Sequence, residues 1–293
     1  MIDKKIKVLV ISDHPLSPSG VGTQTKYMIE SCLKTGKFSF VCLGGAIKHL
    51  NYNPIKIDPY GDDFTVIPVD GYGNHEQIRS LLTMHKPDIL WFMTDPRFFH
   101  WLWEIENEIR ACVPMVYYHV WDNYPYPKFN KTYYDSNDFI ACISKVTHKI
   151  VENVSPDVDS CYLPHAVNNE VFKPMEKEEY YEKIMQSLPQ LKDKFIFFWN
   201  NRNARRKQSG SLIFWFKKFL DKVGHDKAVL LMHTDPYDKH GQDLNAIVNE
   251  LGLVNGEVVF STQPVDSGIL AQLYNLADCT INISDAEGFG LAT

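Results

Sequence analysis

The amino-acid sequence predicts an α/β protein built from two doubly wound domains, of which the second is incomplete. Three observations lead to this prediction. Short apolar runs alternate with longer amphipathic segments, the alternation restarts near residue 175, and fewer strands follow that point than precede it. Nearly continuous apolar runs are typical of parallel strands covered on both faces, and their alternation with helices predicts a parallel sheet between helical layers. The length of 293 residues also favours two domains over one.

The first domain is predicted over residues 1–170, and its strands and helices alternate from the start. Apolar runs predict strands at 7–12, 38–44, 64–70, 88–94, 114–120 and 138–144, with a further strand from about 160. Amphipathic segments predict helices at 23–35, 74–85 and 144–154. The connector LPHAVNNEVFKP, bounded by prolines, then closes the domain.

The second domain is predicted over residues 175–293 and begins with a surface helix at 176–188. Its strands are predicted at 195–200, 228–234, 257–262 and 278–284. Doubly wound domains bind ligands at the carboxyl ends of their strands, and two such domains are expected to face a shared cleft. Residues that directly follow a predicted strand are therefore the candidates for binding and catalysis.

The overall composition is that of a globular cytoplasmic protein. Hydrophobic residues make up 44% and charged residues 23% of the chain, and no apolar stretch approaches the ~20 residues of a membrane span. The first apolar run is too short for a signal peptide. The net charge of −6 and the pI of about 6.0 argue against a nucleic-acid partner, which needs a basic surface. Six cysteines without a C-x-x-C pair are expected to be reduced core residues.

A glycine-containing turn follows the first predicted strand. Gly20 and Gly22 lie in SPSGVGTQ, just before a helix expected to start near Thr23. A glycine-rich turn at a helix N-terminus suits an anion or a closely packed ligand. The turn lacks the full G-x-G-x-x-G pattern, so a nicotinamide dehydrogenase is disfavoured and a simple flexible loop stays an alternative.

A basic loop, WNNRNARRKQSGS, follows the first strand of the second domain. Its four cations are Arg202, Arg205, Arg206 and Lys207, in a protein that is acidic overall. Cations at the carboxyl end of a parallel strand are placed to bind a diphosphate. A solvated basic loop is the alternative, but the location favours the binding function.

His119 ends the strand predicted at 114–120 and is a candidate for catalysis on that ground, although a structural role is equally compatible with the sequence. The D-x-D triplet Asp157-Val158-Asp159 lies at the amino end of a strand, away from the expected ligand side, and is interpreted as a chance match. No cluster has zinc-ligand spacing, and no metal site is expected.

Taken in order, these segments resemble glycosyltransferase family 4, retaining glycosyltransferases of the GT-B type with two Rossmann-like domains. The resemblance spans the whole chain: the glycine turn, His119, the connector, the Arg202-x₄-Lys207 pair, and Glu-Gly-Phe-Gly-Leu at 287–291. Two positions depart from the family pattern. Ala166 replaces a glycine in the connector, and Asn201 replaces the glycine before Arg202.

The resemblance implies a donor substrate, a nucleotide-diphosphate sugar, and no separate cofactor. Arg202 and Lys207 would hold the donor diphosphate, and Glu287 would contact hydroxyls of the donor sugar. His119 would lie near the reacting sugar. The backbone would lie close to the sugar diphosphate of the donor at two places. These are Gly20 and Gly22 in the first, acceptor-side domain, and Gly288, Phe289, Gly290 and Leu291 in the second, donor-side domain.

The same chemistry follows from the residues alone. Breaking a sugar–diphosphate bond leaves growing negative charge on the leaving group, which Arg202 and Lys207 can stabilise without a metal. Retaining enzymes of this type resemble a same-face displacement, so no protein nucleophile is expected. The acceptor is a glycan, a lipid or a small molecule, and the segments VDGYGN and WDNYPYP are candidates for its site.

The family motif is Glu-x₇-Glu, and its second glutamate holds the ribose hydroxyls. Counted from Glu287, that position falls beyond Thr293. The resemblance therefore predicts a C-terminally truncated donor domain and impaired activity of this chain alone, and it makes a second chain that completes the domain a candidate partner.

Two other functions remain open from the sequence. The first is a noncatalytic nucleotide-sugar or glycan-binding remnant, or one half of a two-chain transferase. The second is a sugar-nucleotide epimerase of similar architecture. Donor turnover distinguishes the transferase from the remnant, and product identity distinguishes it from the epimerase.

Overall fold

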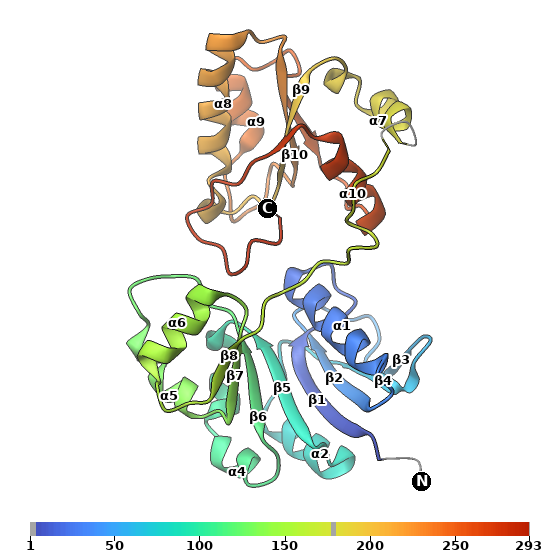
Figure 1. Cartoon of the computed structure of the whole chain (residues 1–293), viewed down its shortest axis with the longest axis vertical. Coiled ribbons are helices and arrows are strands. Elements are labelled where there is room, and N and C mark those ends of the chain that lie inside the picture. The colour runs from blue at the N-terminus through green and yellow to red at the C-terminus, as the bar shows by residue number, and fades with distance from the viewer. Residues whose placement is uncertain (1–3, 177–179, 293) are drawn as a thin grey trace. The chain divides into compact units, whose positions relative to one another are not determined.

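The computed structural model describes residues 4–176 and 180–292 (Figure 1). Its internal contacts divide the chain into two compact units, unit 1 (residues 1–166) and unit 2 (residues 167–293). The sequence placed this boundary between residues 170 and 175. Each unit is a sheet with helices on both faces, so each is described on its own.

Unit 1 is built on an eight-stranded sheet of order β3-β4-β2-β1-β5-β6-β7-β8. Every neighbouring pair is parallel except β3 and β4, which are antiparallel. The strands are β1 (Ile6–Asp13), β2 (Phe38–Gly45), β3 (Ile55–Ile57), β4 (Gly61–Pro68), β5 (Ile89–Thr94), β6 (Met115–His119), β7 (Phe139–Cys142) and β8 (Ser160–Tyr162). The parallel sheet brings the carboxyl ends of β1, β2, β5 and β6 to one edge.

Two hydrophobic clusters cover the two faces of this sheet, because apolar runs supply buried side chains in both directions. Residues of α1 (Gly20–Leu33) pack on one face with Val8, Val10 and Phe40. The other face carries a cluster around Leu9, Ile11 and other strand residues. The helices that contribute to it are α2 (His75–His85), α3 (His100–Trp103), α4 (Glu106–Arg110), α5 (Lys131–Asp135) and α6 (Lys145–Val154).

Unit 2 is built on a four-stranded parallel sheet of order β11-β10-β9-β12. Its strands are β9 (Phe195–Asn200), β10 (Ala228–His233), β11 (Val258–Ser261) and β12 (Cys279–Thr280). Figure 1 shows α8 (Ser209–Val223) and α9 (Leu244–Glu250) on one side of the sheet, and α7 (Tyr181–Ser187) and α10 (Ser267–Leu276) on the other. The two clusters of buried residues in this unit follow the same division.

The two-domain α/β class predicted from the sequence is the class observed, and each predicted strand overlaps an observed one. The surface helix predicted at 176–188 is observed as α7 (Tyr181–Ser187), and its residues 177–179 lie outside the described residues. Three other details differ. Helix α1 begins at Gly20, not near Thr23, because the Ser19 side chain accepts the Gly22 amide and caps it there. The short antiparallel strand β3 was not predicted. The run at 278–284 pairs as a ladder over only Cys279–Thr280 before the chain turns.

All six cysteines are unpaired thiols in this structure. Cys42 and Cys142 are buried as expected, but Cys112 is exposed, and Cys32, Cys161 and Cys279 are half-buried. The prediction of core cysteines is therefore right for two of the six positions. Within the described ranges, none of the helices has the length and apolar character needed to cross a membrane.

Candidate functional site

The segment WNNRNARRKQSGS spans the end of β9, a loop and the start of α8, and from here on the basic loop means residues 201–208 between β9 and α8. One buried amide, that of Asn203, holds this loop in place. The Asn203 Nδ2 donates to the carbonyl of Gln242 at 2.7 Å, and its Oδ1 accepts from the Ser209 hydroxyl at 2.7 Å. These bonds tie the loop to the β10–α9 connection and to the start of α8. Gly241 permits this approach, since a Cβ there would lie 2.1 Å from the Asn203 carbonyl oxygen.

Lys207 and Glu287 form the central ion pair of the candidate site. Lys207 ends a short 3₁₀ turn (Arg205–Lys207), and its Nζ lies 2.5 Å from Glu287 Oε2. The side chain of Lys207 is only 8% exposed and that of Glu287 23% exposed, so the pair is substantially shielded from water. A shielded ion pair interacts more strongly than one in bulk water, which makes this contact a defined feature of the loop.

Glu287 is held as a carboxylate. Burial alone would raise the pKa of Glu287, but hydrogen bonds from Lys207 and Ser284, with the charge of Lys207, outweigh burial and lower it below the ordinary value. The Asn282 amide donates to the other carboxylate oxygen at 3.2 Å. Glu287 is therefore an ionised acceptor whose orientation is set from both oxygens.

The segment that carries Glu287, residues 284–292, lies against the basic loop. The Asp285 amide donates to the Arg206 carbonyl at 2.8 Å, and the Arg206 guanidinium reaches back to the Ala286 carbonyl at 2.5 Å. Gly290 has φ of 86°, a left-handed conformation that favours glycine. Backbone geometry thus already accounts for one of the two glycines in the Glu-Gly-Phe-Gly-Leu motif.

Arg202 does not join the Lys207–Glu287 pair. Its guanidinium binds Asp238 in the β10–α9 connection, with Nε 2.6 Å from Oδ2, and its side chain is 60% exposed. This bond raises the pKa of Arg202 and lowers that of Asp238. Arg205 has no carboxylate within ion-pair distance among the residues that the structure describes, and it is exposed.

Gly20 and Gly22 both lie in the first turn of α1, at the carboxyl end of β1. A Cβ at Gly22 would lie 2.4 Å from the Ser17 hydroxyl and 2.6 Å from the His14 carbonyl. The close packing of the turn therefore requires Gly22 whether or not a ligand approaches it.

His119 ends β6 as predicted, but its side chain is completely buried within unit 1. The imidazole Nε2 shares a hydrogen bond of 2.7 Å with the Tyr134 hydroxyl, and the ring packs against Tyr117. Burial lowers the pKa of His119 to about 3, so the ring is neutral at physiological pH. The His119 carbonyl accepts from the Ile143 amide at 3.3 Å. A role of His119 at the sugar stays a prediction.

Four residues around the basic loop were not singled out from the sequence. Asn203 anchors the loop, Asp238 binds Arg202, and Asn282 and Ser284 orient Glu287. The residue types offered one signal, since Asn and Ser near strand ends bond backbone and carboxylates. Their partners lie on other connections, so spacing along the chain could not reveal them.

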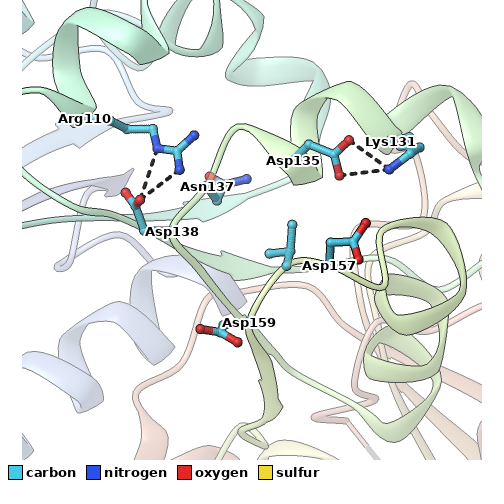
Figure 2. A pocket seen from close by; sticks show the side chains of 8 residues that line it. Arg110, Lys131, Asp135, Asn137, Asp138, Asp157 and Asp159 are labelled. Atoms are coloured by element: carbon cyan, nitrogen blue, oxygen red, sulfur yellow. Dashed lines mark hydrogen bonds and ion pairs between the residues drawn. The ribbon is translucent and has the colours of Figure 1, made fainter.

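A polar pocket of about 290 Å³ lies at the opposite, amino-terminal edge of the unit 1 sheet (Figure 2). Arg110 binds Asp138 and Lys131 binds Asp135 across its rim, and Asp157 and Asp159 also line it. The D-x-D triplet therefore does line a pocket. Within the described ranges, however, no group of three or more His, Cys, Asp or Glu side chains could hold a metal ion.

The fold is shared with solved structures, whereas no protein-family profile and no curated protein matches the sequence. An E. coli structure described as trehalose-6-phosphate bound with UDP-2-fluoro glucose is 13% identical, with a TM-score of 0.68 over 96% of this chain and 79% of that one. Anabaena Alr3699/HepE, in complex with UDP and glucose, is 14% identical, with a TM-score of 0.68 over 97% and 75%. A glycosyltransferase from Rickettsia africae is 18% identical, with a TM-score of 0.68 over 96% and 73%.

These similarities define the class of fold. The chain has two Rossmann-like α/β domains of the GT-B type, as the sequence predicted. At such low identities the similarity extends to the fold alone.

Proposed function

We propose that this protein is a glycosyltransferase that takes its sugar from a nucleotide-diphosphate donor. The observation that carries the proposal is the Lys207–Glu287 pair at the carboxyl end of β9. It combines a shielded cation for phosphate with an oriented carboxylate for sugar hydroxyls. The GT-B fold, and the complexes of similar structures with UDP, glucose and UDP-2-fluoro glucose, support the same function.

In the proposed mechanism, unit 2 holds the donor through charge. The Lys207 ammonium carries three N–H donors, so it can bind phosphate oxygens while it keeps its bond to Glu287. Arg205, exposed on the same loop, adds a second cation for the diphosphate. The cations stabilise the charge that develops on the leaving diphosphate, and this supplies the electrophilic assistance without a metal.

The reaction that we propose retains the configuration at the anomeric carbon. The bond from the sugar C1 to the diphosphate oxygen breaks while the acceptor oxygen bonds to C1 on the same face. The acceptor proton passes to the departing phosphate oxygen, so no protein nucleophile is needed. Glu287 contributes by holding the sugar hydroxyls while positive charge develops on the ring.

The test is donor turnover by the purified chain. UDP-glucose is supplied with a panel of glycan, lipid and small-molecule acceptors, and UDP release and glycosylated product are measured together. We expect product with an α-linkage from the α-linked donor, unaffected by a chelator. Donor binding without product for any acceptor would favour a noncatalytic binding protein. Absence of binding to every member of a panel of nucleotide-diphosphate sugars that differ in base, UDP-glucose among them, would overturn the proposal.

Glu287→Gln distinguishes the role of the carboxylate from that of the loop. Gln keeps the shape but loses the charge that pairs with Lys207. We expect slower turnover with UDP affinity retained, because Glu287 is proposed to bind the sugar hydroxyls and Lys207 to bind the phosphate oxygens. Equal turnover by the variant and the parent would remove Glu287 from the proposed mechanism.

A further inference from the structure

Three shielded polar atoms in unit 2 have no hydrogen-bond partner within residues 4–176 and 180–292. They are the indole Nε1 of Trp199, the amide Nδ2 of Asn201 and the hydroxyl of Thr234. Trp199 is 0% exposed and Thr234 8% exposed. Buried polar groups are nearly always paired in folded proteins, so three such groups in one small domain require an explanation.

The three groups lie at the carboxyl edge of the unit 2 sheet, on two neighbouring strands. Trp199 is the second-last residue of β9 and is aligned with Met232 of β10, and both belong to the cluster covered by α8 and α9. Asn201 directly follows the end of β9 and Thr234 the end of β10, where the Thr234 amide donates to the Ser261 carbonyl at 3.1 Å. The basic loop departs from the same edge.

The neighbouring Asn203 shows that the fold can satisfy an amide at this position. Its Nδ2 donates to two carbonyls, those of Gln242 and Pro236, and its Oδ1 accepts from Ser209. Asn201, two residues earlier on the same loop, has no acceptor for its amide hydrogens in the described chain. The difference points to an acceptor that the protein itself does not supply.

The hydrogen-bonding chemistry restricts what the missing acceptor can be. An indole N–H and an amide NH₂ are donors only, and a hydroxyl can donate as well. The complementary group is an oxygen that offers lone pairs. The adjoining loop carries four cations, and four carboxylates lie on or beside it: Asp235, Asp238, Asp285 and Glu287. Arg205, however, has no carboxylate within ion-pair distance among the described residues, so an oxygen that carries negative charge finds an available cation on this loop.

We infer that Trp199, Asn201 and Thr234 form a donor cluster that binds an acceptor oxygen of the nucleotide part of the donor. This inference rests on the proposed function and assigns a specificity-determining role to residues outside the Arg-x₄-Lys and Glu-Gly-Phe-Gly-Leu motifs. Phosphate oxygens and base carbonyl oxygens share the required chemistry. The cluster selects ligands by the acceptors they present, whereas Lys207 selects by charge.

The test measures binding of UDP, UMP, uridine and pyrophosphate to the full chain by titration calorimetry. Thr234→Val removes the hydroxyl with little change of shape, and Thr234→Ser is the matched control that keeps it. We expect Thr234→Val to weaken UDP binding about tenfold and Thr234→Ser to change it little, since one hydrogen bond to a charged group is lost. A loss shared by UDP and pyrophosphate assigns the cluster to a phosphate oxygen, and a loss shared by UDP and uridine assigns it to a base carbonyl.

Asn201→Asp is a second, independent test of the cluster, because it replaces the amide donor of Asn201 by a negatively charged carboxylate. We expect it to weaken pyrophosphate and UDP more strongly than Thr234→Val does. Thermal unfolding of each variant without ligand checks that the fold is intact.

Unchanged UDP affinity in both Thr234→Val and Asn201→Asp, with lowered melting temperatures, would show a buried structural water and overturn the inference. The proposed function would survive that result. If the unmodified chain binds no nucleoside diphosphate and no nucleotide-diphosphate sugar from a panel of different bases, the proposed function and the inference both fail.

Discussion

His119 in unit 1 and Lys207 in unit 2 are two polar residues that fill comparable places in similar sheets, and their surroundings differ. His119 ends β6 and is enclosed by aromatic side chains, neutral and hydrogen-bonded to Tyr134. Lys207 follows β9 on a polar loop, charged and paired with a carboxylate that is itself held by Asn282. Both were predicted as site residues from their position after a strand.

The difference teaches that a strand end offers two uses for a polar side chain. Where helices close over the strand end, the side chain becomes part of the core, and burial disfavours its charged form, as it does for His119. Where a loop turns away, a shielded cation can keep a charged partner, as Lys207 does with the partly exposed Glu287, and can exchange that partner for a ligand. We therefore propose that unit 2 supplies the donor chemistry, and we expect removal of the His119 ring to lower the stability of unit 1.

The largest effect on donor affinity is expected for Lys207→Ala. The substitution removes the proposed charge-assisted contact to phosphate, worth about 1.5–3 kcal/mol, and would leave the Glu287 carboxylate without its counter-ion beside the donor diphosphate. UDP affinity measured by calorimetry should fall about 100-fold. Lys217→Ala, which breaks only a surface pair with Asp221, is the control and should bind UDP normally. Normal UDP affinity in Lys207→Ala would show that Lys207 does not bind the donor phosphates, and the proposed contrast with His119 would be wrong.

A smaller effect is expected for Arg202→Ala. Because Arg202 is exposed and already neutralised by Asp238, it has less to offer a phosphate, and UDP affinity should fall by about tenfold at most. Asp238→Asn sharpens this point, since it releases Arg202 while keeping the shape of its partner. We expect Asp238→Asn to bind UDP as tightly as the parent or more tightly. A larger loss in Arg202→Ala than in Lys207→Ala would reverse the ranking of the two cations.

No measurable change in UDP affinity is expected for His119→Ala, because unit 2 is proposed to hold the nucleotide. Unit 1 should instead lose about 2–4 kcal/mol of its free energy of unfolding, as large-to-small changes in a packed core do. Urea unfolding and UDP titration of the same preparation separate the two effects. If a folded His119→Phe protein binds UDP normally but loses turnover at saturating donor, the predicted role of His119 at the reacting sugar is supported.

The pH dependence of stability provides the finest test. The pKa of His119 is about 3 in the folded state and ordinarily 6.5. Between these two pH values the imidazole is protonated in the unfolded chain and neutral in the folded chain. The stabilisation is therefore complete above pH 6.5 and is lost as the pH falls toward 3, by about 1.4 kcal/mol per pH unit. His119→Phe should unfold with a shallower dependence between pH 6.5 and 5. His165, whose pKa burial lowers to about 4, is common to both proteins and cancels in the difference. Parallel pH profiles would show that the His119 ring is not sealed from protons.

Patterns local in sequence predicted most of the fold. Runs such as residues 7–12 and 228–234 are apolar on both faces of the pleat, so they could be recognised as central parallel strands without knowledge of their neighbours. Strand β3 could not be recognised this way, because its three residues pair with β4 through a local antiparallel contact that leaves two of them exposed. Strand β12 was predicted too long, since only two residues join the ladder.

The Lys207–Glu287 contact could be anticipated because both residues stand in motifs that the resemblance associates with one ligand. Structure alone revealed the partners of the other polar residues. Asp238 binds Arg202 through a loop that belongs to the next strand, and Tyr134 reaches His119 from α5. Such contacts depend on how connections fold over the sheet edge, and residue spacing carries no information about it.

The close approach of Lys207 and Glu287 also gives the protein a chemical reporter. An amine and a carboxylate at 2.5 Å can be joined by a zero-length carbodiimide cross-link, which yields one defined peptide pair in a mass spectrum. The yield of that amide records how often the two side chains meet. A ligand that draws the ammonium toward its phosphates lowers the yield, so occupancy of unit 2 becomes readable from a covalent product without any knowledge of the acceptor.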